Sequence, residues 1–575
     1  MQSTNNKLND LNFCLRKKKI DYLLISTSDE FLNEYVPDFN MRLKWLTNFS
    51  GSNGYALISG KENFFFTDGR YTLQAKKELH KSFEIFDLKE VNIIDFLREK
   101  LMKKKILVDT RCLTKDFVLQ VLNTLKYSKN KIIHDKNGLV DSLWINRPKE
   151  KNRKFFILNK KYAGESFQEK LKKIKPKDNT VLVISAPESV CWLLNIRGYD
   201  LDNTPLVFSR LIISKNKVEI FINKQKIPDD FSKHYSNINI IDMDHFAARL
   251  KKIKNKKVQI DNQISYFYYK ILSENELFIK DDPCKILKSK KNNIEVKCSR
   301  KVHIFDSISL IKFFHWLEKV RENKDISEFE ASQKLENFKK ECKEFFSLSF
   351  PIISATGPNA SVIHYKPKKK SLILKDDDLF LCDSGGQYFG GTTDITRTIH
   401  LGKGKPKLSL KNIYTRVLIG HINLSTIKFP AGTKGFQLDS IARVNLWNAG
   451  LDYNHGTGHG VGSFLGVHEG PQSISKNSNN VALEPGMIIS NEPGFYKDKN
   501  FGIRIENLVL VKKSSLKNFY EFETLSLFPY EKKLIDFKLL SNSQKKWIYS
   551  YHKKIYKKVS PYLSKQDLKW LKNKI

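Results

Sequence analysis

Residues 379–397 read LFLCDSGGQYFGGTTDITR and place two acidic side chains on either side of a glycine-rich stretch. Asp383 ends an apolar run, and Asp394 lies eleven residues later in a segment that alternates with period two. The intervening glycines suit the turns of an antiparallel hairpin. Two strands joined in this way would bring both carboxylates together, so the sequence predicts an acidic pair held by a hairpin.

Three later segments carry the same kinds of side chain. His459 lies in a loop, HGTGHGVG, whose only bulky side chains are histidines. Glu492 follows a short apolar run, and Glu506 ends a strand pattern that puts it on the same face as Arg504. Each acid alone is typical of a turn or a strand end. Four acids beside buried strands would repel one another if they converged.

Two divalent cations would cancel four negative charges and leave one histidine as a neutral ligand. An oxygen-rich set with a single imidazole favours hard or borderline ions such as Mn²⁺ over a tetrahedral structural zinc. Two such ions, roughly 3.5–4 Å apart, would share a bridging hydroxide suited to hydrolysis. The spacing therefore predicts a dinuclear hydrolytic centre.

The chain has 575 residues, which suggests about three or four domains of roughly 150 residues each. Two segments follow one order: an apolar strand, an acidic residue, a Trp-Leu-x-Asn run and a glycine. This order predicts two related α/β domains at 1–148 and 149–288, followed by a third domain at 289–575. Helices are expected at the following segments: 11–19, 294–320, 327–346 and within 541–575.

Composition excludes several classes of protein. Hydrophobic residues make up 40% of the chain and aromatic residues 12%, so it is neither a disordered polyelectrolyte nor a collagen. The formal charge of +38 comes from lysines in short runs mixed with asparagine, such as 251–257 and 288–293. Neither a helix-turn-helix signature nor an aromatic stacking motif accompanies these runs. We interpret them as background and expect no nucleic-acid partner.

Cysteine usage and hydropathy bear on location. The seven cysteines are dispersed without a Cys-x-x-Cys pair, which is typical of a reducing compartment. No stretch approaches the roughly 18 apolar residues of a membrane span, and the amino terminus has no signal-peptide pattern. We expect a soluble, cytoplasmic protein without a membrane partner.

Longer strings resemble one family over nearly the whole chain. The C-terminal part contains HGTGHGVGSF (455–464), GVHEGP (466–471), SNEPGFY (490–496) and FGIRIENLVLV (501–511). The earlier parts contain TDGRYTLQA (67–75) and CWLLNIRGYDLDNTPLVFS (191–209). These strings are similar to the dinuclear metallopeptidases of the pita-bread fold, and in particular to the three-domain, long form of the aminopeptidase P family. One departure is Phe495, where that family usually has tyrosine.

This resemblance implies five metal ligands: Asp383, Asp394, His459, Glu492 and Glu506. Asp383 would hold one ion, Asp394 and Glu506 would bridge the two, and His459 with Glu492 would complete the second site. Glu492 would also be the general base or proton shuttle.

It also implies roles for residues outside the metal ligands. His364 and His468 would hydrogen-bond the substrate carbonyl and stabilise the oxyanion. His455 and Arg504 would line the pocket for proline. The implied assembly is a homodimer formed through the catalytic domain.

The implied reaction releases one N-terminal residue from peptides with proline in the second position. Two alternatives stay open. A prolidase would use the same ligands but cleave only Xaa-Pro dipeptides. A basic binding module of the same fold could retain the ligand residues and bind nucleic acid or protein instead. The sequence contains no HExxH, G-x-S-x-G or P-loop motif that would support other chemistry.

Overall fold

The computed structural model describes residues 3–176 and 179–575. The chain divides into two compact units, each described here by itself. The first unit contains most of the chain up to Cys284. The second contains 285–575 together with two short earlier segments, 159–165 and 203–205.

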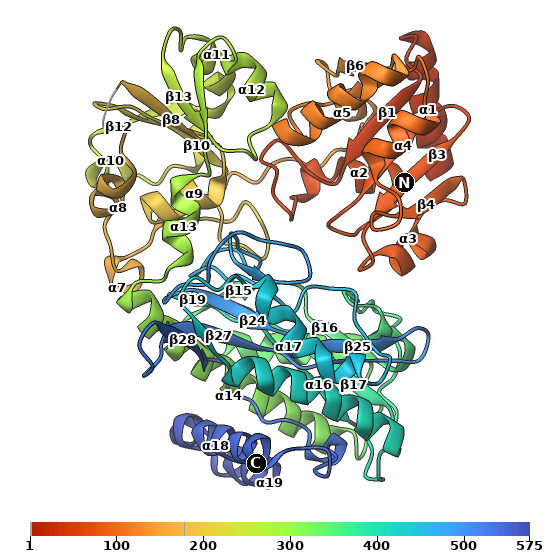
Figure 1. The fold of residues 1–575 in the computed structure, drawn as a ribbon, viewed down its shortest axis with the longest axis vertical. Helices are drawn as coiled ribbons and strands as arrows, with labels where there is room; N and C mark the ends of the chain where they lie inside the picture. Colours follow the sequence, from red (N-terminus) through yellow and green to blue (C-terminus); the bar gives the residue numbers. More distant parts are fainter. Residues whose placement is uncertain (1–2, 177–178) are drawn as a thin grey trace. The chain divides into compact units, whose positions relative to one another are not determined.

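The first unit contains two six-stranded sheets of the same topology (Figure 1). The first sheet has the order β4-β3-β2-β1-β5-β6. Its strands are β1 (Tyr22–Ser26), β2 (Tyr55–Ile58), β3 (Asn63–Thr67), β4 (Phe83–Asp87), β5 (Lys105–Val108) and β6 (Lys131–His134). The β1–β2 and β2–β3 pairs are antiparallel, whereas the other three pairs are parallel.

The second sheet repeats this arrangement in the order β12-β11-β10-β8-β13-β14. Its strands are β8 (Thr180–Ile184), β10 (Ser209–Ile213), β11 (Val218–Ile222), β12 (Ile238–Asp242), β13 (Lys257–Ile260) and β14 (Glu276–Ile279). Again the β8–β10 and β10–β11 pairs are antiparallel and the others parallel. The prediction of two related α/β folds in tandem is confirmed.

The repeated Trp-Leu-x-Asn run has a local explanation. It ends a helix after the first strand of each sheet: α2 (Arg42–Thr47) and α9 (Pro187–Leu194). The asparagine that follows each helix is left-handed, with φ of 67° at Asn48 and 51° at Asn195. Asparagine tolerates this conformation better than most residues and therefore stops both helices at equivalent places.

The remaining longer helices of the first unit are α1 (Thr4–Lys17), α3 (Thr72–Glu78), α4 (Ile93–Lys100), α5 (Lys115–Ser128), α8 (Phe167–Ile174), α11 (Phe246–Lys251) and α12 (Tyr266–Leu272). Helix α1 begins earlier than the predicted 11–19 segment because the Ser3 side chain caps it, accepting from the Asn6 N–H. Leu8, Leu11 and Leu15 then form its buried face.

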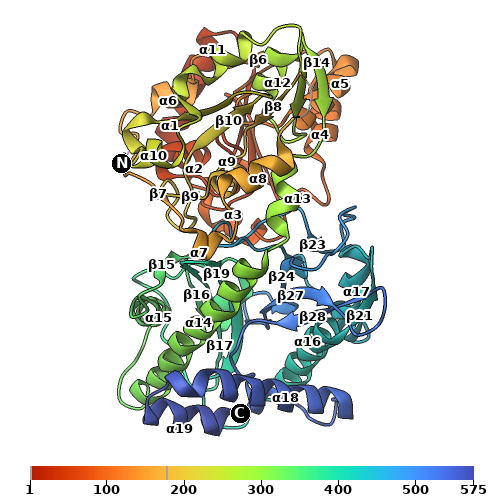
Figure 2. The ribbon, with the colours of Figure 1, turned by 90° about the vertical axis from the view of Figure 1, so that its left-hand side faces the viewer.

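The second unit has a mixed α/β fold around several short sheets (Figure 2). Its main helices are α14 (Asn293–Val320), α15 (Glu328–Lys340), α16 (Leu408–Thr426), α17 (Phe436–Trp447), α18 (Asn542–Val559) and α19 (Lys565–Lys574). Its site-bearing strands are β16 (Ile353–Thr356), β17 (Leu379–Ser384), β20 (Ile395–His400), β22 (Gly458–His459), β24 (Ile488–Asn491), β25 (Gly494–Lys497), β26 (Phe501–Arg504) and β27 (Asn507–Lys513). Helix α18 contacts both α14 and α16.

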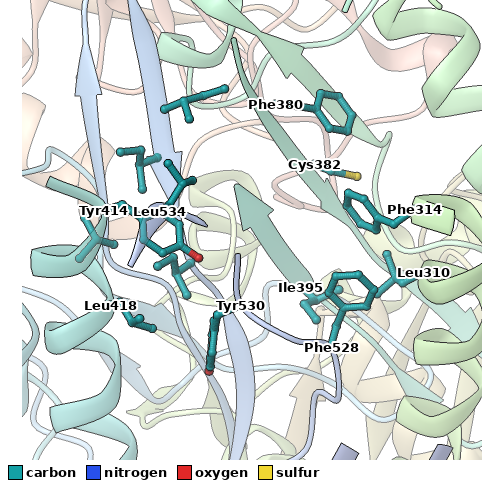
Figure 3. Packing of buried hydrophobic residues seen from close by; sticks show 14 of the residues in the cluster. Leu310, Phe314, Phe380, Cys382, Ile395, Tyr414, Leu418, Phe528, Tyr530 and Leu534 are labelled. Atoms are coloured by element: carbon teal, nitrogen blue, oxygen red, sulfur yellow. The ribbon is translucent and has the colours of Figure 1, made fainter. Parts of the chain in front are cut away.

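One large apolar core lies between these helices and strands (Figure 3). Leu310 and Phe314 of α14 lie on one side of the view, and Tyr414 and Leu418 of α16 lie on the other. Ile395, at the start of β20, packs in the same cluster. The core therefore fixes the hairpin strand that follows Asp394.

The helix predicted at 327–346 is too long. Helix α15 ends at Lys340, and Phe345–Leu348 forms strand β15 instead. This strand pairs with β18 (Gly386–Tyr388), so pairing with a distant segment overrides a helical spacing of apolar residues. The predicted 294–320 helix is confirmed by α14.

Among the described residues, we find no helix that combines the length and the apolar character needed to cross a membrane.

Gly385, between the two predicted acidic residues, tests the tightness of the hairpin. A Cβ atom there would lie 2.0 Å from the Thr393 carbonyl oxygen and 2.2 Å from the Ser349 Oγ. We expect Gly385→Ala to lower the free energy of unfolding by about 1–3 kcal/mol through overpacking. Thermal unfolding measures this, with Gly60→Ala as the control because only one atom lies within 4.0 Å of its added Cβ. Equal stability of the two variants would contradict the close packing.

Candidate metal centre

Asp383 and Asp394 come from an antiparallel strand pair, as the hairpin pattern predicts. Strand β17 pairs with β20, with Asp383 opposite Thr396 and Ser384 opposite Ile395. Asp394 directly precedes β20, and both aspartates are buried. The glycine-rich connection between the strands forms part of a separate sheet, β15-β18-β19, in which β19 is Gly391–Thr392.

His459 and Glu492 are linked through one serine. The His459 N–H donates to the Ser490 Oγ at 2.9 Å, and that hydroxyl donates to Glu492 Oε1 at 3.1 Å. The preceding Gly458 lies against β24, where a Cβ would be 2.0 Å from the Ser490 carbonyl oxygen. The absence of a side chain at this position therefore lets the histidine strand approach the glutamate strand.

Thr396 holds Glu506 in place. The Glu506 N–H donates to the Thr396 carbonyl at 3.1 Å, and the Thr396 hydroxyl donates to Glu506 Oε2 at 2.7 Å. The same hydroxyl accepts from Arg504 Nε at 3.1 Å. Arg504 and Glu506 thus lie on one side of the segment, as alternation predicts, while Ile503 and Ile505 belong to the apolar core.

These side chains converge on one point. The His459 Nε2 atom lies 3.5 Å from both Asp394 Oδ2 and Glu492 Oε1. Ligand atoms of Asp394, His459 and Glu506 all lie within 4.8 Å of one another. Asp383 interacts electrostatically with Asp394, while its Oδ2 accepts from Arg504 Nη2 at 2.7 Å.

Burial and mutual repulsion dominate the electrostatics. Burial raises the pKa of Asp394 well above its usual range, and the Asp383 and Glu492 charges raise it further. Burial likewise raises the pKa of Glu506, reinforced by Asp394 and Glu492. The pKa of Glu492 is also raised by burial, although His459 and Arg504 oppose that effect.

Three buried carboxylate oxygens at this point have no hydrogen-bond partner within the described part of the chain: Asp383 Oδ1, Asp394 Oδ1 and Glu506 Oε1. Buried charged oxygens without donors are costly, and a cation is the partner that such oxygens accept. The donor set of four carboxylates and one imidazole fits divalent ions with oxygen preference. The residues therefore fit the predicted metal centre.

The two auxiliary histidines, His364 and His468, which we expect at the substrate carbonyl, lie in two different loops. The His468 ring packs edge-on against the His459 ring, with centroids 4.3 Å apart. His364 follows a short helical turn, 357–361, and its neighbour Ile363 accepts from Arg504 Nη2 at 3.5 Å through its carbonyl oxygen. On the other side of His364, the Tyr365 hydroxyl donates to the buried Glu328 carboxylate at 2.7 Å.

His455 and Arg504, which we expect to line the proline pocket, share a hydrogen-bond partner, Tyr496, that sequence reasoning missed. The Tyr496 hydroxyl lies 2.9 Å from His455 Nε2 and accepts from Arg504 Nη1 at 2.8 Å. Alternation along β25 was the available signal, because it puts Phe495 and Tyr496 on opposite faces. Phe495 packs near Phe501, with ring centroids 6.1 Å apart, and the hydroxyl that contacts Arg504 comes from Tyr496.

The raised carboxyl pKa values predict how a divalent ion affects stability. Without a cation, Asp394 and Glu506 bind protons more tightly in the folded than in the unfolded protein. The metal-free protein therefore loses stability as pH rises above about 4, where carboxyls of the unfolded chain ionise. We expect the difference in thermal midpoint between Mn²⁺-saturated and chelator-treated protein to widen from about pH 5 to about pH 8.

Asp394→Asn provides the comparison in the metal-free state: it removes one of the repelling charges, so the thermal midpoint of the chelator-treated variant should fall less between about pH 5 and about pH 8 than that of the chelator-treated wild type. A difference that does not change with pH would contradict the proposed repulsion among the carboxylates.

Comparison with known proteins agrees with this geometry. Residues 297–513 match the model of metallopeptidase family M24, and 518–575 match the C-terminal region of that peptidase. Residues 7–143 and 146–295 each match a creatinase/prolidase N-terminal domain. The two tandem sheets and the centre thus lie in segments with recognised relatives.

The chain is similar over its full length to proteins named Xaa-Pro aminopeptidase. The chain is 37% identical to a probable Xaa-Pro aminopeptidase P of Coprinopsis cinerea, over 99% of this chain and 97% of that protein. It is 35% identical to Xaa-Pro aminopeptidase 1 of Dictyostelium discoideum, over 99% and 96%.

A solved structure is similar over the whole length. The crystal structure of X-prolyl aminopeptidase from Caenorhabditis elegans, described as a cytosolic enzyme with a di-nuclear active site, superposes with a TM-score of 0.95. It is 30% identical and covers 100% of this chain and 99% of its own. The fold, the converging donor set and these full-length similarities together place the chain in metallopeptidase family M24, among the aminopeptidase P proteins.

Proposed function

We propose that this protein is an Xaa-Pro aminopeptidase that uses two divalent metal ions to remove the N-terminal residue from peptides with proline in the second position. The observation that carries the proposal is the convergence of Asp394, His459, Glu492 and Glu506, with Asp383 acting on them electrostatically and three buried carboxylate oxygens that find no hydrogen-bond partner among the described residues. The named function of the full-length relatives supports the substrate class.

We assign the metal ligands as the sequence indicates: Asp383, Asp394, His459, Glu492 and Glu506. Asp394 and Glu506 would bridge the two ions, and Asp383 would take part through Oδ1, while its Oδ2 accepts from Arg504. Divalent ions at this site would supply Lewis-acid assistance to peptide hydrolysis. We propose Mn²⁺ because the donor set is rich in oxygen.

Glu492 is the proton carrier in this proposal. Its Oε1 lies 3.5 Å from His459 Nε2, at the centre of the site, where the carboxylate would take a proton from the attacking water and pass it to the proline nitrogen as that nitrogen leaves. The Ser490 hydroxyl, 3.1 Å from Glu492 Oε1, fixes the orientation of the carboxylate. This transfer is needed because an amide nitrogen leaves as an amine only after it gains a proton.

His468 and His364 are assigned to the substrate carbonyl. His468 packs beside His459, so an N–H of its ring can donate a hydrogen bond to the substrate carbonyl oxygen, on which negative charge develops. The Tyr496 hydroxyl joins His455 and Arg504 into one wall of the site. We assign this wall to the proline side of the substrate.

Three broader expectations remain proposals. We propose a cytosolic enzyme, supported by the description of the Caenorhabditis elegans relative and by seven free cysteines. We propose a homodimer through the catalytic part of the chain. Domain boundaries near residues 148 and 288 are proposed from sequence.

A tripeptide assay tests the activity directly. With Mn²⁺ present, we expect Arg-Pro-Pro to release free arginine, because the proposed reaction needs only a free N-terminal residue and proline in the second position. Cleavage of Arg-Pro without cleavage of Arg-Pro-Pro would identify a dipeptidase instead. Salt-sensitive nucleic-acid binding by a protein with no peptidase activity would support the binding-module alternative.

Substitutions separate metal binding from oxyanion stabilisation. We expect Asp394→Ala or Glu506→Ala to lose metal and activity together, because each supplies an oxygen between the two ions. We expect His468→Ala to keep its metal content but to lower kcat by about 10²–10³-fold, the effect of losing one oxyanion donor. Metal analysis beside steady-state kinetics measures both. Full activity of the alanine variants at the bridging positions would refute the bridging assignment.

A further inference from the structure

Two lysines in a run that we interpreted as background charge are buried. Lys288, at the end of α13 (Pro283–Ser289), and Lys291, just before α14, are 6% and 5% exposed. The Lys288 Nζ lies 3.0 Å from Glu469 Oε2, and the Lys291 Nζ lies 3.5 Å from Glu469 Oε1. Interpretation of this run as surface background is therefore wrong for these two side chains.

The Glu469 carboxylate, which pairs with both lysines, lies directly against the glycine-rich loop 455–462 that carries His459. A Cβ at Gly462 would be 2.6 Å from Glu469 Oε2, and one at Gly460 would be 2.0 Å from the Glu469 carbonyl oxygen. The Glu469 N–H donates to the Gly460 carbonyl at 2.8 Å. Glycine at both positions thus makes room for Glu469 beneath the loop that carries His459.

Glu469 is also the chain neighbour of His468. Ion pairs at both carboxylate oxygens and a hydrogen bond from its N–H fix Glu469 in three directions. The peptide that joins it to His468 therefore has little freedom, and His468 stays packed against His459. A displacement of about 1 Å in a catalytic group can cost about 10²-fold in rate.

We propose that Lys288 and Lys291 are positioning residues that act through Glu469 to hold His468 in place for oxyanion stabilisation. The proposal rests on the peptidase function proposed above. Neither lysine touches the substrate in this account. Because oppositely charged partners buried together specify one arrangement, the three side chains fix the loop more sharply than apolar contacts would.

The same segment contains a matched exposed pair. Lys290 lies between the two buried lysines and pairs with Glu484 at 2.6 Å, with exposed side-chain fractions of 36% and 41%. Exposed ion pairs contribute little to the stability of the fold or to the placement of neighbouring residues. Lys290→Met therefore removes one lysine from this run without disturbing Glu469, which makes it the control.

The decisive experiment compares Glu469→Gln in two backgrounds. In the otherwise native protein, we expect kcat to fall about 10–100-fold, the scale of losing a supporting partner, with KM and metal content changed less than about twofold. In the His468→Ala background, we expect the same substitution to lower kcat less than about twofold, because the group it positions is gone. Lys290→Met should leave kcat unchanged. An equal fold-loss in both backgrounds would overturn the proposal.

Lys288→Met supplies a second route if Glu469→Gln does not fold, because Lys291 then still pairs with Glu469. The same two-background comparison applies to it. Its loss of kcat should likewise disappear when His468 is absent, and a loss that persists would overturn the proposal.

A second readout needs no turnover. In protein labelled at histidine Cε1 and loaded with diamagnetic Zn²⁺, the His468 resonance is the one that His468→Ala removes. We expect Glu469→Gln to shift it and Lys290→Met to leave it in place. An unmoved resonance would overturn the proposal. The resonance measurement does not depend on peptidase activity. The proposed function is refuted separately, if the wild-type protein cleaves no Xaa-Pro peptide.

Discussion

Repulsion among four closely placed carboxylates, three of them buried, is the constraint on which the rest of the second unit depends. Asp394 and Glu506 are almost fully buried, and burial together with neighbouring acids raises the pKa of each. A fold that gathers like charges out of water gains nothing from them unless cations join them. The strands, the glycines and the threonine and serine hydroxyls around the centre all hold these acids where separate side chains would move apart.

Much of this could be predicted from the sequence because the signals are local. The hairpin that joins Asp383 to Asp394 is encoded by alternation and glycine within one short stretch, and the strand pairing confirms it. The tandem sheets are encoded by a repeated order of strand, helix and asparagine stop, which the two left-handed residues Asn48 and Asn195 explain.

What the sequence did not reveal depends on distant segments. Strand β15 forms where a helix was expected because β18 offers it a partner. Tyr496 joins His455 and Arg504 across three separate segments, a contact that no single stretch encodes. Lys288 and Lys291 looked like any other lysines of a basic chain, since only the fold brings Glu469 to them.

A common arrangement supports both auxiliary histidines. His364 is followed by Tyr365, whose hydroxyl binds the buried Glu328, and His468 is followed by Glu469. Each histidine thus has a chain neighbour fixed through a buried carboxylate outside the metal set, Glu328 in the first case and Glu469 itself in the second. Precise placement of the reactive groups therefore depends on a surrounding layer of buried charges as well as on the ligands.

The central claim is that four acids and one histidine of the second unit exist to hold two divalent ions. The most direct test is the metal stoichiometry of the dialysed, Mn²⁺-loaded protein, measured by elemental analysis against protein concentration. The account predicts two ions per chain, whereas one ion or none in active protein would contradict it.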